Sequence, residues 1–176
     1  MKPTRGSDPR QVLAQGKHMR LMICDGWEYA ERTTPNSTAA SVIAVTDEGK
    51  LLLTEQYRVP VNKQVIELPA GLVGDIPGEA EEAAAVAASR ELIEETGYEA
   101  LVLEHLITGP TSAGLANETL CLFVAKGLRK IGPGGGDASE NIVVHEVPLA
   151  ELRSWLNEQM RQGKLVDPKV YLAFAF

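Results

Sequence analysis

The chain has few cysteines, few histidines and no long hydrophobic run. Two cysteines and three histidines occur among 176 residues. Neither Cys24 nor Cys121 has a cysteine or histidine at metal-site spacing, so both are interpreted as structural residues of a protein from a reducing compartment. No stretch approaches the roughly 18 apolar residues of a membrane span. The amino terminus lacks the apolar segment of a signal peptide. We therefore expect no membrane contact and a cytoplasmic location.

Positive charge is also scarce. Seventeen lysines and arginines stand against 24 acidic residues, a formal net charge of −7. This balance argues against nucleic acid or an anionic membrane as the main partner. The 44% apolar content is ordinary for a protein with a hydrophobic core, and the length suits one domain with a small accessory element.

Acidic residues gather on one predicted helix. The alanine-rich run 83–88 favours a helix that continues to Gly97, a residue suited to a left-handed C-terminal cap. Glu91, Glu94 and Glu95 are three and four positions apart, so we expect their carboxylates to share one side. Such carboxylates repel unless a hard cation such as Mg²⁺ lies between them. The alternative is a solvated acidic face.

The sequence around these glutamates favours a metal site over a solvated acidic face. Residues 90–98 read Arg-Glu-Leu-Ile-Glu-Glu-Thr-Gly-Tyr, which matches the end of the Nudix box at every position. The chain therefore resembles a Nudix hydrolase, a family that cleaves a nucleoside diphosphate linked to another group. One departure concerns the box's opening glycine, because Ile76 stands where it would fall. If Gly71 is that glycine, the loop carries five extra residues, and Glu79 and Glu82 both remain candidates for the first box glutamate.

The resemblance implies a metal site and a set of ligands. Glu91, Glu94 and Glu95, with the backbone carbonyl of Ala70, are expected to hold Mg²⁺, with Mn²⁺ as the alternative ion. Arg90 is expected to orient the box carboxylates rather than to touch substrate.

The remaining pattern predicts an α/β (α+β) protein with mixed-sheet layers and a small N-terminal antiparallel β element. The resemblance implies that the mixed sheet belongs to a Nudix-like α/β/α sandwich. Residues 1–37 are assigned to an N-terminal arm and β element for dimerisation, and residues 38–176 to the hydrolase domain. Asp25-Gly26 is a strong hairpin signal. The expected strands are 19–24, 27–33, 41–46, 50–56, 65–68, 100–107, 119–125 and 142–147, and the expected later helices are 149–162 and 168–176.

Two further segments resemble the ADP-ribose and nucleoside diphosphate sugar branch of the family. They are Glu-Gln-Tyr-Arg at 55–58 and Glu-Leu-Pro-Ala-Gly at 67–71. By this resemblance Arg58 reaches the substrate and the Ala70 carbonyl binds metal. The alternatives are a surface ion pair between Arg58 and Glu55, and a plain turn at Ala70.

Residues 27–34 resemble a segment of ADP-sugar pyrophosphatases. The resemblance implies that Trp27 stacks on the base, that Glu28 hydrogen-bonds it, and that Arg32 meets the substrate across a dimer interface. The alternative for Trp27 is core or interface packing. Since small hairpins cannot bury a core alone, we expect a homodimer through this element.

A water molecule that attacks phosphorus needs a proton acceptor. Glu140 ends the segment 131–140, which holds four glycines, and its context resembles the mobile loop that supplies a catalytic glutamate in ADP-ribose pyrophosphatases. Asp137 is the competitor, a solvated loop acid is the alternative, and a box glutamate such as Glu94 remains open as the base.

The expected range of substrates follows from a proline that this chain lacks. ADP-ribose-selective members carry proline sixteen positions after the last box glycine, whereas this chain has Ala113 there and Pro110 three positions earlier. This favours a broader enzyme over an ADP-ribose-specific pyrophosphatase. Glu118, where these enzymes often have a loop glutamate, either contacts the site or is a strand-edge charge.

The predicted reaction is Mg²⁺-dependent hydrolysis of the pyrophosphate bond of nucleoside diphosphate sugars. The products are a nucleoside monophosphate and a sugar 1-phosphate, or ribose 5-phosphate from ADP-ribose. A nucleoside triphosphate or RNA-cap pyrophosphohydrolase is disfavoured by the acidic balance and by residues 55–58. A non-catalytic nucleotide-sugar sensor is disfavoured because all three box glutamates are present.

Overall fold

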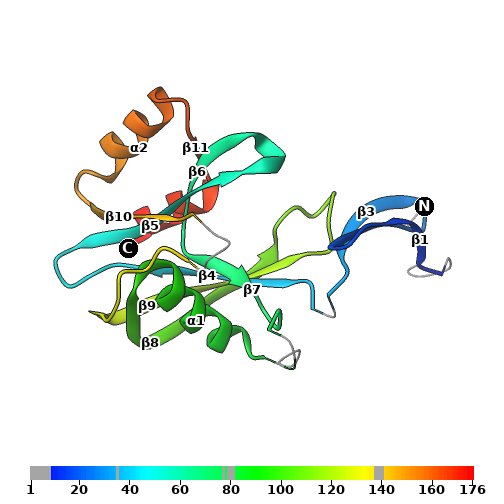
Figure 1. The fold of residues 1–176 in the computed structure, drawn as a ribbon, viewed down its shortest axis with the longest axis horizontal. Helices are drawn as coiled ribbons and strands as arrows, with labels where there is room; N and C mark the ends of the chain where they lie inside the picture. The colour runs from blue at the N-terminus through cyan, green and yellow to red at the C-terminus, as the bar shows by residue number, and fades with distance from the viewer. Residues whose placement is uncertain (1–8, 35, 77, 79–81, 137–140) are drawn as a thin grey trace.

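Three β-sheets organise the part of the chain that the structure describes (Figure 1). This computed structural model describes residues 9–34, 36–76, 78, 82–136 and 141–176. Two four-stranded sheets build the body, and a three-stranded sheet projects from one side of it.

The projecting sheet is antiparallel, with the order β1-β2-β3. It consists of β1 Gln11–Gln15, β2 Met19–Cys24 and β3 Trp27–Arg32. Asp25 and Gly26 join β2 to β3 with positive φ angles of 49° and 77°, the backbone that a type I′ turn requires. The predicted hairpin is confirmed. The sequence did not predict β1, because its residues are exposed and the alternation of apolar and polar residues in it is weak.

Both sheets of the body contain parallel and antiparallel pairs. Their orders are β10-β5-β6-β11 and β7-β4-β9-β8. The pairs β4–β9 and β6–β11 are parallel, and the others are antiparallel. The strands are β4 Thr38–Ala44, β5 Lys50–Arg58, β6 Lys63–Glu67, β7 Ala70–Leu72, β8 Tyr98–Pro110, β9 Thr119–Lys130, β10 Val143–Pro148 and β11 Leu165–Val166.

Helices cover the two outer faces of the body (Figure 1). The α-helices are α1 Ala84–Thr96 and α2 Leu152–Arg161, and the 3₁₀ helices are η1 Val59–Val61 and η2 Pro168–Ala175. Neither α-helix of the described ranges has the length and apolarity needed to cross a bilayer.

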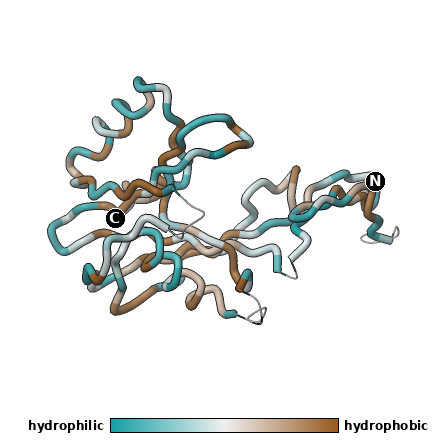
Figure 2. Tube along the Cα trace, in the orientation of Figure 1, coloured by the Kyte–Doolittle hydropathy of each residue, from teal (hydrophilic) through white to brown (hydrophobic). Residues whose placement is uncertain are grey.

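β4 is the central strand because both of its faces are buried. Val42 belongs to a core cluster with Leu92 of α1, whereas Ile43 belongs to a second cluster with Leu156 of α2 and Val170 of η2. Figure 2 shows the hydrophobic colouring concentrated along these central strands. Two cores on opposite faces of one strand layer make an α/β/α sandwich, so the predicted fold class is confirmed.

Some element boundaries differ from the sequence prediction. The helix expected from residue 149 begins at Leu152, after a turn that follows Pro148. The last helix is 3₁₀ rather than α, and Asp167 caps it, because Asp167 Oδ1 accepts a hydrogen bond from the Lys169 N–H at 2.8 Å. Ala70–Leu72, for which the sequence predicted no strand, pairs with β4 as β7.

The glycine-rich segment after β9 closes the C-terminal end of α1. Gly97 caps the helix with a φ of 76° and donates its N–H to the Ile93 carbonyl at 2.9 Å. Gly135 and Gly136 donate to the carbonyls of Glu95 and Glu94 at 2.8 and 3.0 Å. The sequence predicted a mobile loop here, but these bonds hold residues 131–136 against the helix that carries the acidic residues.

Candidate active site

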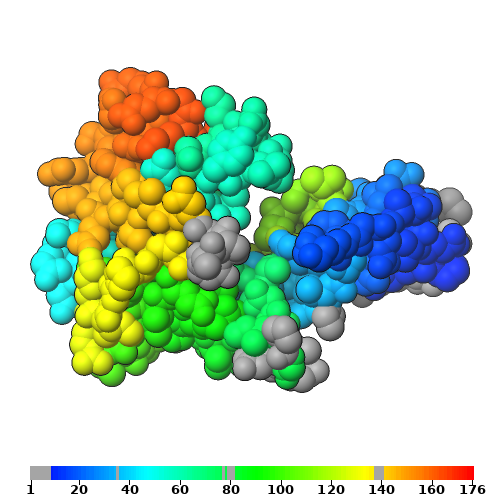
Figure 3. Space-filling model, in the orientation of Figure 1, coloured from blue at the N-terminus to red at the C-terminus, as the bar shows by residue number. Residues whose placement is uncertain are grey.

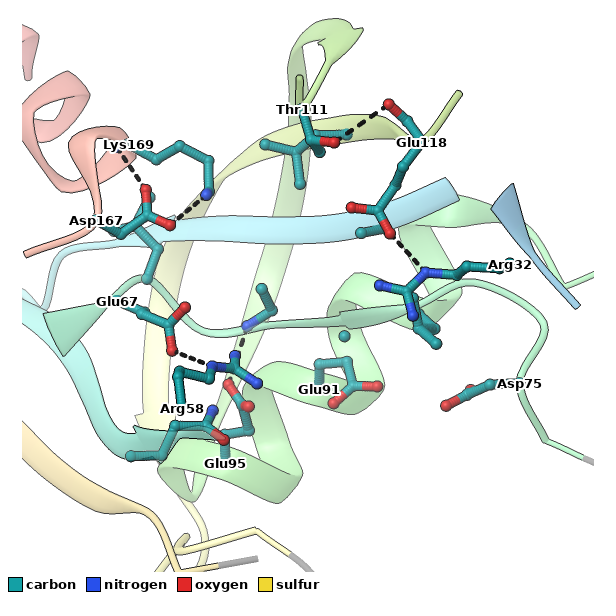
Figure 4. A pocket seen from close by; sticks show the side chains of 17 residues that line it. Arg32, Arg58, Glu67, Asp75, Glu91, Glu95, Thr111, Glu118, Asp167 and Lys169 are labelled. Atoms are coloured by element: carbon teal, nitrogen blue, oxygen red, sulfur yellow. Dashed lines mark hydrogen bonds and ion pairs between the residues drawn. The ribbon is translucent and has the colours of Figure 1, made fainter. Parts of the chain in front are cut away.

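A cleft of about 420 Å³ lies where β5, β6, β7, α1 and η2 come together. In Figure 3 the surface is hollowed between the turquoise β5–β6 hairpin and the projecting N-terminal sheet. The charged side chains that line it converge from separate elements (Figure 4): Arg32, Arg58, Glu67, Asp75, Glu91, Glu95, Glu118, Asp167 and Lys169.

Glu91 and Glu95 bring two carboxylates from α1 to the wall of this cleft. They are one helical turn apart on the buried face of α1, with only 9% and 2% of their surface exposed. Glu95 Oε2 accepts a hydrogen bond from the backbone N–H of Ala70 at 2.9 Å. Two carboxylates on the face of a helix that normally carries core residues indicate a functional site.

Gly71 allows the Glu91 carboxylate to approach β7. A Cβ atom at residue 71 would lie 1.9 Å from Glu91 Oε1, so no larger residue fits without displacing the glutamate. This contact favours Gly71 as the opening glycine of the box, with the five-residue lengthening in the loop that follows.

Arg90 is the centre of an ion-pair network beside the cleft. Its guanidinium donates to groups on the helix and on the preceding loop, so one cation holds the two segments together. The acceptors are Glu91 Oε1 at 2.7 Å, Asp75 Oδ1 at 3.0 Å, Glu94 Oε2 at 3.2 Å, the Leu72 carbonyl at 3.2 Å and Glu82 Oε1 at 3.3 Å.

Glu82 is the innermost carboxylate of this network, since its side chain is only 2% exposed. It also accepts the N–H of Gly74 at 2.9 Å. Burial by itself would raise the pKa of Glu82, but the Gly74 N–H and Arg90 together lower it below its usual value. Glu82 thus orders the loop and Arg90, whereas Glu79 lies outside the described residues.

Glu94 lies apart from the other two box glutamates. Its side chain is half exposed, pairs with Arg90 and does not line the cleft. In a helix of about 3.6 residues per turn, residue i+3 falls short of a full turn and i+4 passes it. Glu91 and Glu95 therefore share the cleft side, whereas Glu94 diverges from it. Among the described residues, no three His, Cys, Asp or Glu side chains are close enough together to hold a metal ion as they stand.

Burial raises the pKa of Glu91 to about 7. Arg90 opposes this by favouring the carboxylate, and the negative charges of Glu94 and Asp75 add to the rise. A carboxylate with this pKa is desolvated and short of positive charge, which a divalent cation would supply.

The donor set fits a hard divalent cation. Glu91, Glu95 and Ala70 line one cleft and offer carboxylate and carbonyl oxygens. Mg²⁺ is usually held by one or two carboxylates, with water and substrate phosphate completing its shell. Two protein carboxylates facing an open cleft match that requirement.

The two arginines predicted to meet the substrate both reach this cleft (Figure 4). Arg58 Nε donates to Glu67 Oε2 at 2.8 Å, and Arg32 Nε donates to Glu118 Oε2 at 2.5 Å. The alternative ion pair between Arg58 and Glu55 does not form. Glu55 instead accepts from Lys164 at 2.8 Å and lies 2.8 Å from a ring nitrogen of His145, on the other face of β5.

Trp27 and Glu28, both predicted to bind substrate, do not line the cleft within one chain. Trp27, 62% exposed, lines a separate shallow hollow with Asn117 and its neighbours, and Glu28 is exposed on the same strand. Glu140 and its competitor Asp137 lie outside the described residues.

Sequence reasoning did not assign a site role to several lining residues. They are Gln56, Glu67, Asp75, Thr111, Asp167 and Lys169. Glu67 was visible only as part of the motif at 67–71, and Asp167 only as the residue before the expected helix 168–176. Asp75 and Lys169 had no sequence signal, because only the tertiary structure brings their segments to the cleft.

A mixed α/β/α sandwich with paired helix carboxylates beside an arginine-lined cleft defines a Nudix-type hydrolase. The family description "NUDIX domain" matches residues 35–167, so the chain belongs to this family and the predicted hydrolase is confirmed. A "Methanol dehydrogenase activator" of Bacillus methanolicus is 40% identical over 94% of this chain and 88% of its own length.

Two further comparisons agree with this family assignment. An "ADP-ribose pyrophosphatase" of Bacillus subtilis is 38% identical over 81% of this chain and 77% of its own. A solved structure described as "Crystal structure of ADP compounds hydrolase" superposes with a TM-score of 0.66 over 85% of this chain and 80% of its own. At 23% identity it supports the fold alone. The resemblance to the ADP-ribose pyrophosphatase branch is confirmed.

The raised pKa of Glu91 predicts a pH effect on stability without metal. Between its usual value of 4.5 and about 7, the unfolded chain releases this proton while the folded protein keeps it. Stability therefore falls as pH rises through this window, and Glu91→Gln removes that loss, a difference on the order of 1 kcal/mol after allowance for partial exposure. Thermal melts in EDTA at pH 5 and pH 8 measure it.

The matched control is Glu99→Gln, whose carboxylate pairs with Arg129 outside the cleft. Glu99→Gln should keep the wild-type pH dependence. An equal loss from pH 5 to pH 8 in Glu91→Gln and wild type would contradict the raised pKa.

Proposed function

We propose that this protein hydrolyses the pyrophosphate bond of nucleoside diphosphate sugars with Mg²⁺. The products are a nucleoside monophosphate and a sugar 1-phosphate, or ribose 5-phosphate from ADP-ribose. The observation that carries the proposal is the pair of buried carboxylates, Glu91 and Glu95, beside Arg58 in one cleft. The similarity to a pyrophosphatase of ADP-ribose supports it.

The metal ligands in this proposal are Glu91, Glu95, Glu94 and the Ala70 carbonyl, with Mn²⁺ as the alternative ion. When bound, the cation would neutralise phosphate charge and lower the pKa of a water. Glu91 and Glu95 already face the cleft. Glu94 would join them only by leaving its 3.2 Å bond with Arg90, whose other four acceptors would keep the guanidinium in place.

The arginines and a loop acid complete the proposed mechanism. Arg58 turns from Glu67 to the diphosphate, and Arg32 turns from Glu118 to the substrate on the opposite side, because a phosphate oxygen is a stronger competitor for a half-exposed guanidinium. Glu140 accepts the proton of the attacking water, with Glu94 as the alternative base. Glu118 then becomes available to accept a substrate hydroxyl.

Our reason for proposing broad substrate specificity is the loop between β8 and β9. Ala113 occupies the marker position, and Pro110 ends β8 and lines an apolar recess beside the cleft. An enzyme specific for ADP-ribose is the alternative.

Trp27 and Glu28 are proposed to serve the site of a second subunit. Residues 1–37 would form the dimerisation element and residues 38–176 the hydrolase domain. The projecting sheet exposes apolar side chains such as Val12, Leu13 and Leu21, at 50%, 47% and 40%. Exposed apolar side chains on so small a sheet favour a partner that covers them, and two-fold symmetry would bring each Trp27 to the other cleft.

A substrate panel tests the reaction. Phosphate release after a coupled phosphatase is measured for ADP-ribose, UDP-glucose, GDP-mannose and dGTP with Mg²⁺. We expect turnover of several diphosphate sugars, little of dGTP, and none in EDTA. Activity on ADP-ribose alone would replace broad specificity by the ADP-ribose-specific alternative.

Glu95→Gln is expected to lower kcat at least about 100-fold, because it removes a charged ligand. Glu99→Gln is the matched control and should keep wild-type activity. Most of the activity remaining in Glu95→Gln would refute the metal-site assignment.

A mixing experiment tests the shared site. Trp27→Ala and Glu95→Gln are each expected to be nearly inactive, for different reasons, in a homodimer. In an equal mixture, half of the dimers are hybrids, and each hybrid has one site with an intact Trp27 and an intact Glu95. Activity should therefore recover to about one quarter of wild type. No recovery, with light scattering showing exchanged dimers, would place Trp27 and Glu95 of one chain in the same site or Trp27 in none.

A second candidate function is activation of a dehydrogenase, favoured by the similarity to a methanol dehydrogenase activator along 94% of this chain. We expect that adding the protein with Mg²⁺ raises methanol dehydrogenase turnover, and that Glu95→Gln abolishes the increase if hydrolysis is its cause. Activation by Glu95→Gln at the wild-type level would instead indicate a binding effect. No increase with wild-type protein would reject this candidate.

A further inference from the structure

One acidic side chain of the projecting sheet is buried. Glu31 of β3 has only 6% of its side chain exposed, although β1 is exposed along its whole length and Trp27 of β3 itself is 62% exposed. A glutamate is almost never buried without partners, because its charge loses the stabilisation by water. The partners of Glu31 therefore have to account for its burial.

Three donors from separate segments bind the Glu31 carboxylate. Arg20 Nε donates to Oε2 at 2.7 Å, and Asn117 Nδ2 donates to Oε1 at 2.7 Å. The guanidinium of Arg10 also donates to Oε1. Arg20 stands directly opposite Glu31 in the β2–β3 register, whereas Asn117 lies between β8 and β9 of the body. The two arginines hold the carboxylate in place, and Asn117 joins it to another part of the fold.

The backbone of the segment that carries Asn117 runs along β3. The Ala30 N–H donates to the Leu115 carbonyl at 2.8 Å, and the Asn117 N–H donates to the Ala30 carbonyl at 3.3 Å. Ala30 and Ala116 form a parallel bridge. Figure 1 shows the loop after β8 reaching the projecting sheet at this point. Residues 115–117 thus hold an edge of β3 as a neighbouring strand would.

The next residue along each of these two segments lines the cleft. Arg32 follows Glu31, Glu118 follows Asn117, and Arg32 Nε donates to Glu118 Oε2 at 2.5 Å in the cleft (Figure 4). Consecutive side chains of a strand point to opposite faces, so Glu31 and Arg32 lie on the two faces of β3. One pair therefore joins the two segments inside the cleft, and the other pair joins them on the face away from it.

Substrate binding would affect these two pairs differently. In the proposed function Arg32 leaves Glu118 for the substrate, so the pair inside the cleft opens. The Glu31–Asn117 hydrogen bond lies on the other face and can stay closed during this exchange. It then keeps β3 beside the loop while Arg32 is turned to a phosphate oxygen, a contact that tolerates little displacement.

We propose that Glu31 and Asn117 are positioning residues for Arg32, and that their hydrogen bond sets the affinity for the charged part of the substrate. This inference deepens the proposed function and rests on it. Neither side chain lines the cleft, so both act through Arg32. A contact that Arg32 makes equally with the bound substrate and with the transition state lowers KM alone. Its displacement therefore raises KM and leaves kcat nearly unchanged.

Exchanging the donor and the acceptor tests the hydrogen bond itself. Asn117→Asp keeps the shape of the side chain but sets a carboxylate against Glu31, and we expect it to raise KM for the best diphosphate sugar of the panel about tenfold. The double variant Glu31→Gln/Asn117→Asp restores a donor and an acceptor in the opposite direction, and its KM should return to within about threefold of wild type. A folded double variant with the KM of Asn117→Asp would overturn the proposal.

A double-mutant cycle with Arg32→Met tests whether the bond acts through Arg32. Arg32→Met alone should raise KM, and adding Asn117→Asp should then raise KM by less than about twofold. A merely structural role, or an effect through Trp27 in the hollow that Asn117 lines, would give the full increase in both backgrounds and would overturn the proposal. Asn117→Ala removes the donor without adding charge, and it decides the cycle when Asn117→Asp does not fold.

Thr33→Val is the matched control for a lost hydrogen bond in the same sheet. Thr33 Oγ1 donates to the Lys17 carbonyl at 2.8 Å, which joins the end of β3 to the turn between β1 and β2 rather than to the body. Thermal melts should show a lower Tm for both Thr33→Val and Asn117→Asp, whereas only Asn117→Asp should change KM. An equal rise of KM in Thr33→Val would contradict a role specific to the Glu31–Asn117 bond.

The activity of the wild type separates this inference from the proposed function. Hydrolysis of a diphosphate sugar, with the wild-type KM kept in Asn117→Asp and Asn117→Ala, would overturn the positioning role and leave the proposed function intact. No hydrolysis of any diphosphate sugar would overturn both.

Discussion

The burial of two carboxylates on the inner face of α1 is the constraint on which the site depends. Glu91 and Glu95 occupy positions where a helix of this fold would otherwise place core residues, and desolvation makes their charge costly. Three contacts offset this cost. The Ala70 N–H donates to Glu95, the Arg90 guanidinium donates to Glu91, and Gly71 leaves space for the Glu91 carboxylate. The remaining deficit of positive charge faces an open cleft. In the proposed reaction a divalent cation would supply the missing positive charge.

Contacts near its middle and at its C-terminal end hold the same helix to irregular segments of the chain. Near the middle, Arg90 ties it to Asp75 and Glu82 in the segment after β7. At the C-terminal end, the glycine-rich segment donates its N–H groups to the last carbonyls of α1, which the helix itself leaves unpaired. The part of that segment closest to α1 is therefore structural.

The walls of the cleft come from segments that are far apart in the sequence, and each segment supplies a different kind of side chain. α1 supplies the carboxylates of Glu91 and Glu95, β7 supplies Ala70, β5 supplies Arg58, and the N-terminal sheet supplies Arg32. η2 supplies Lys169 and the wall of the apolar recess. The charged side chains thus lie along the cleft, and an apolar wall lies beside it on the η2 side.

The sequence by itself determined the family, the box helix with its Gly97 cap, the Asp25-Gly26 hairpin and the α/β/α class. These follow from local patterns, namely periodicity, turn residues and a nine-residue match, which need no long-range contact to be read. It also identified Glu91, Glu95, Ala70, Arg58, Arg32 and Glu118, all of which line one cleft. Only the tertiary structure decided that Glu94 turns away toward Arg90, that Glu55 pairs with Lys164, and that Asp75 and Lys169 reach the cleft. Those outcomes depend on helix rotation against a sheet and on contacts between segments far apart in the chain, for which local propensity carries no signal.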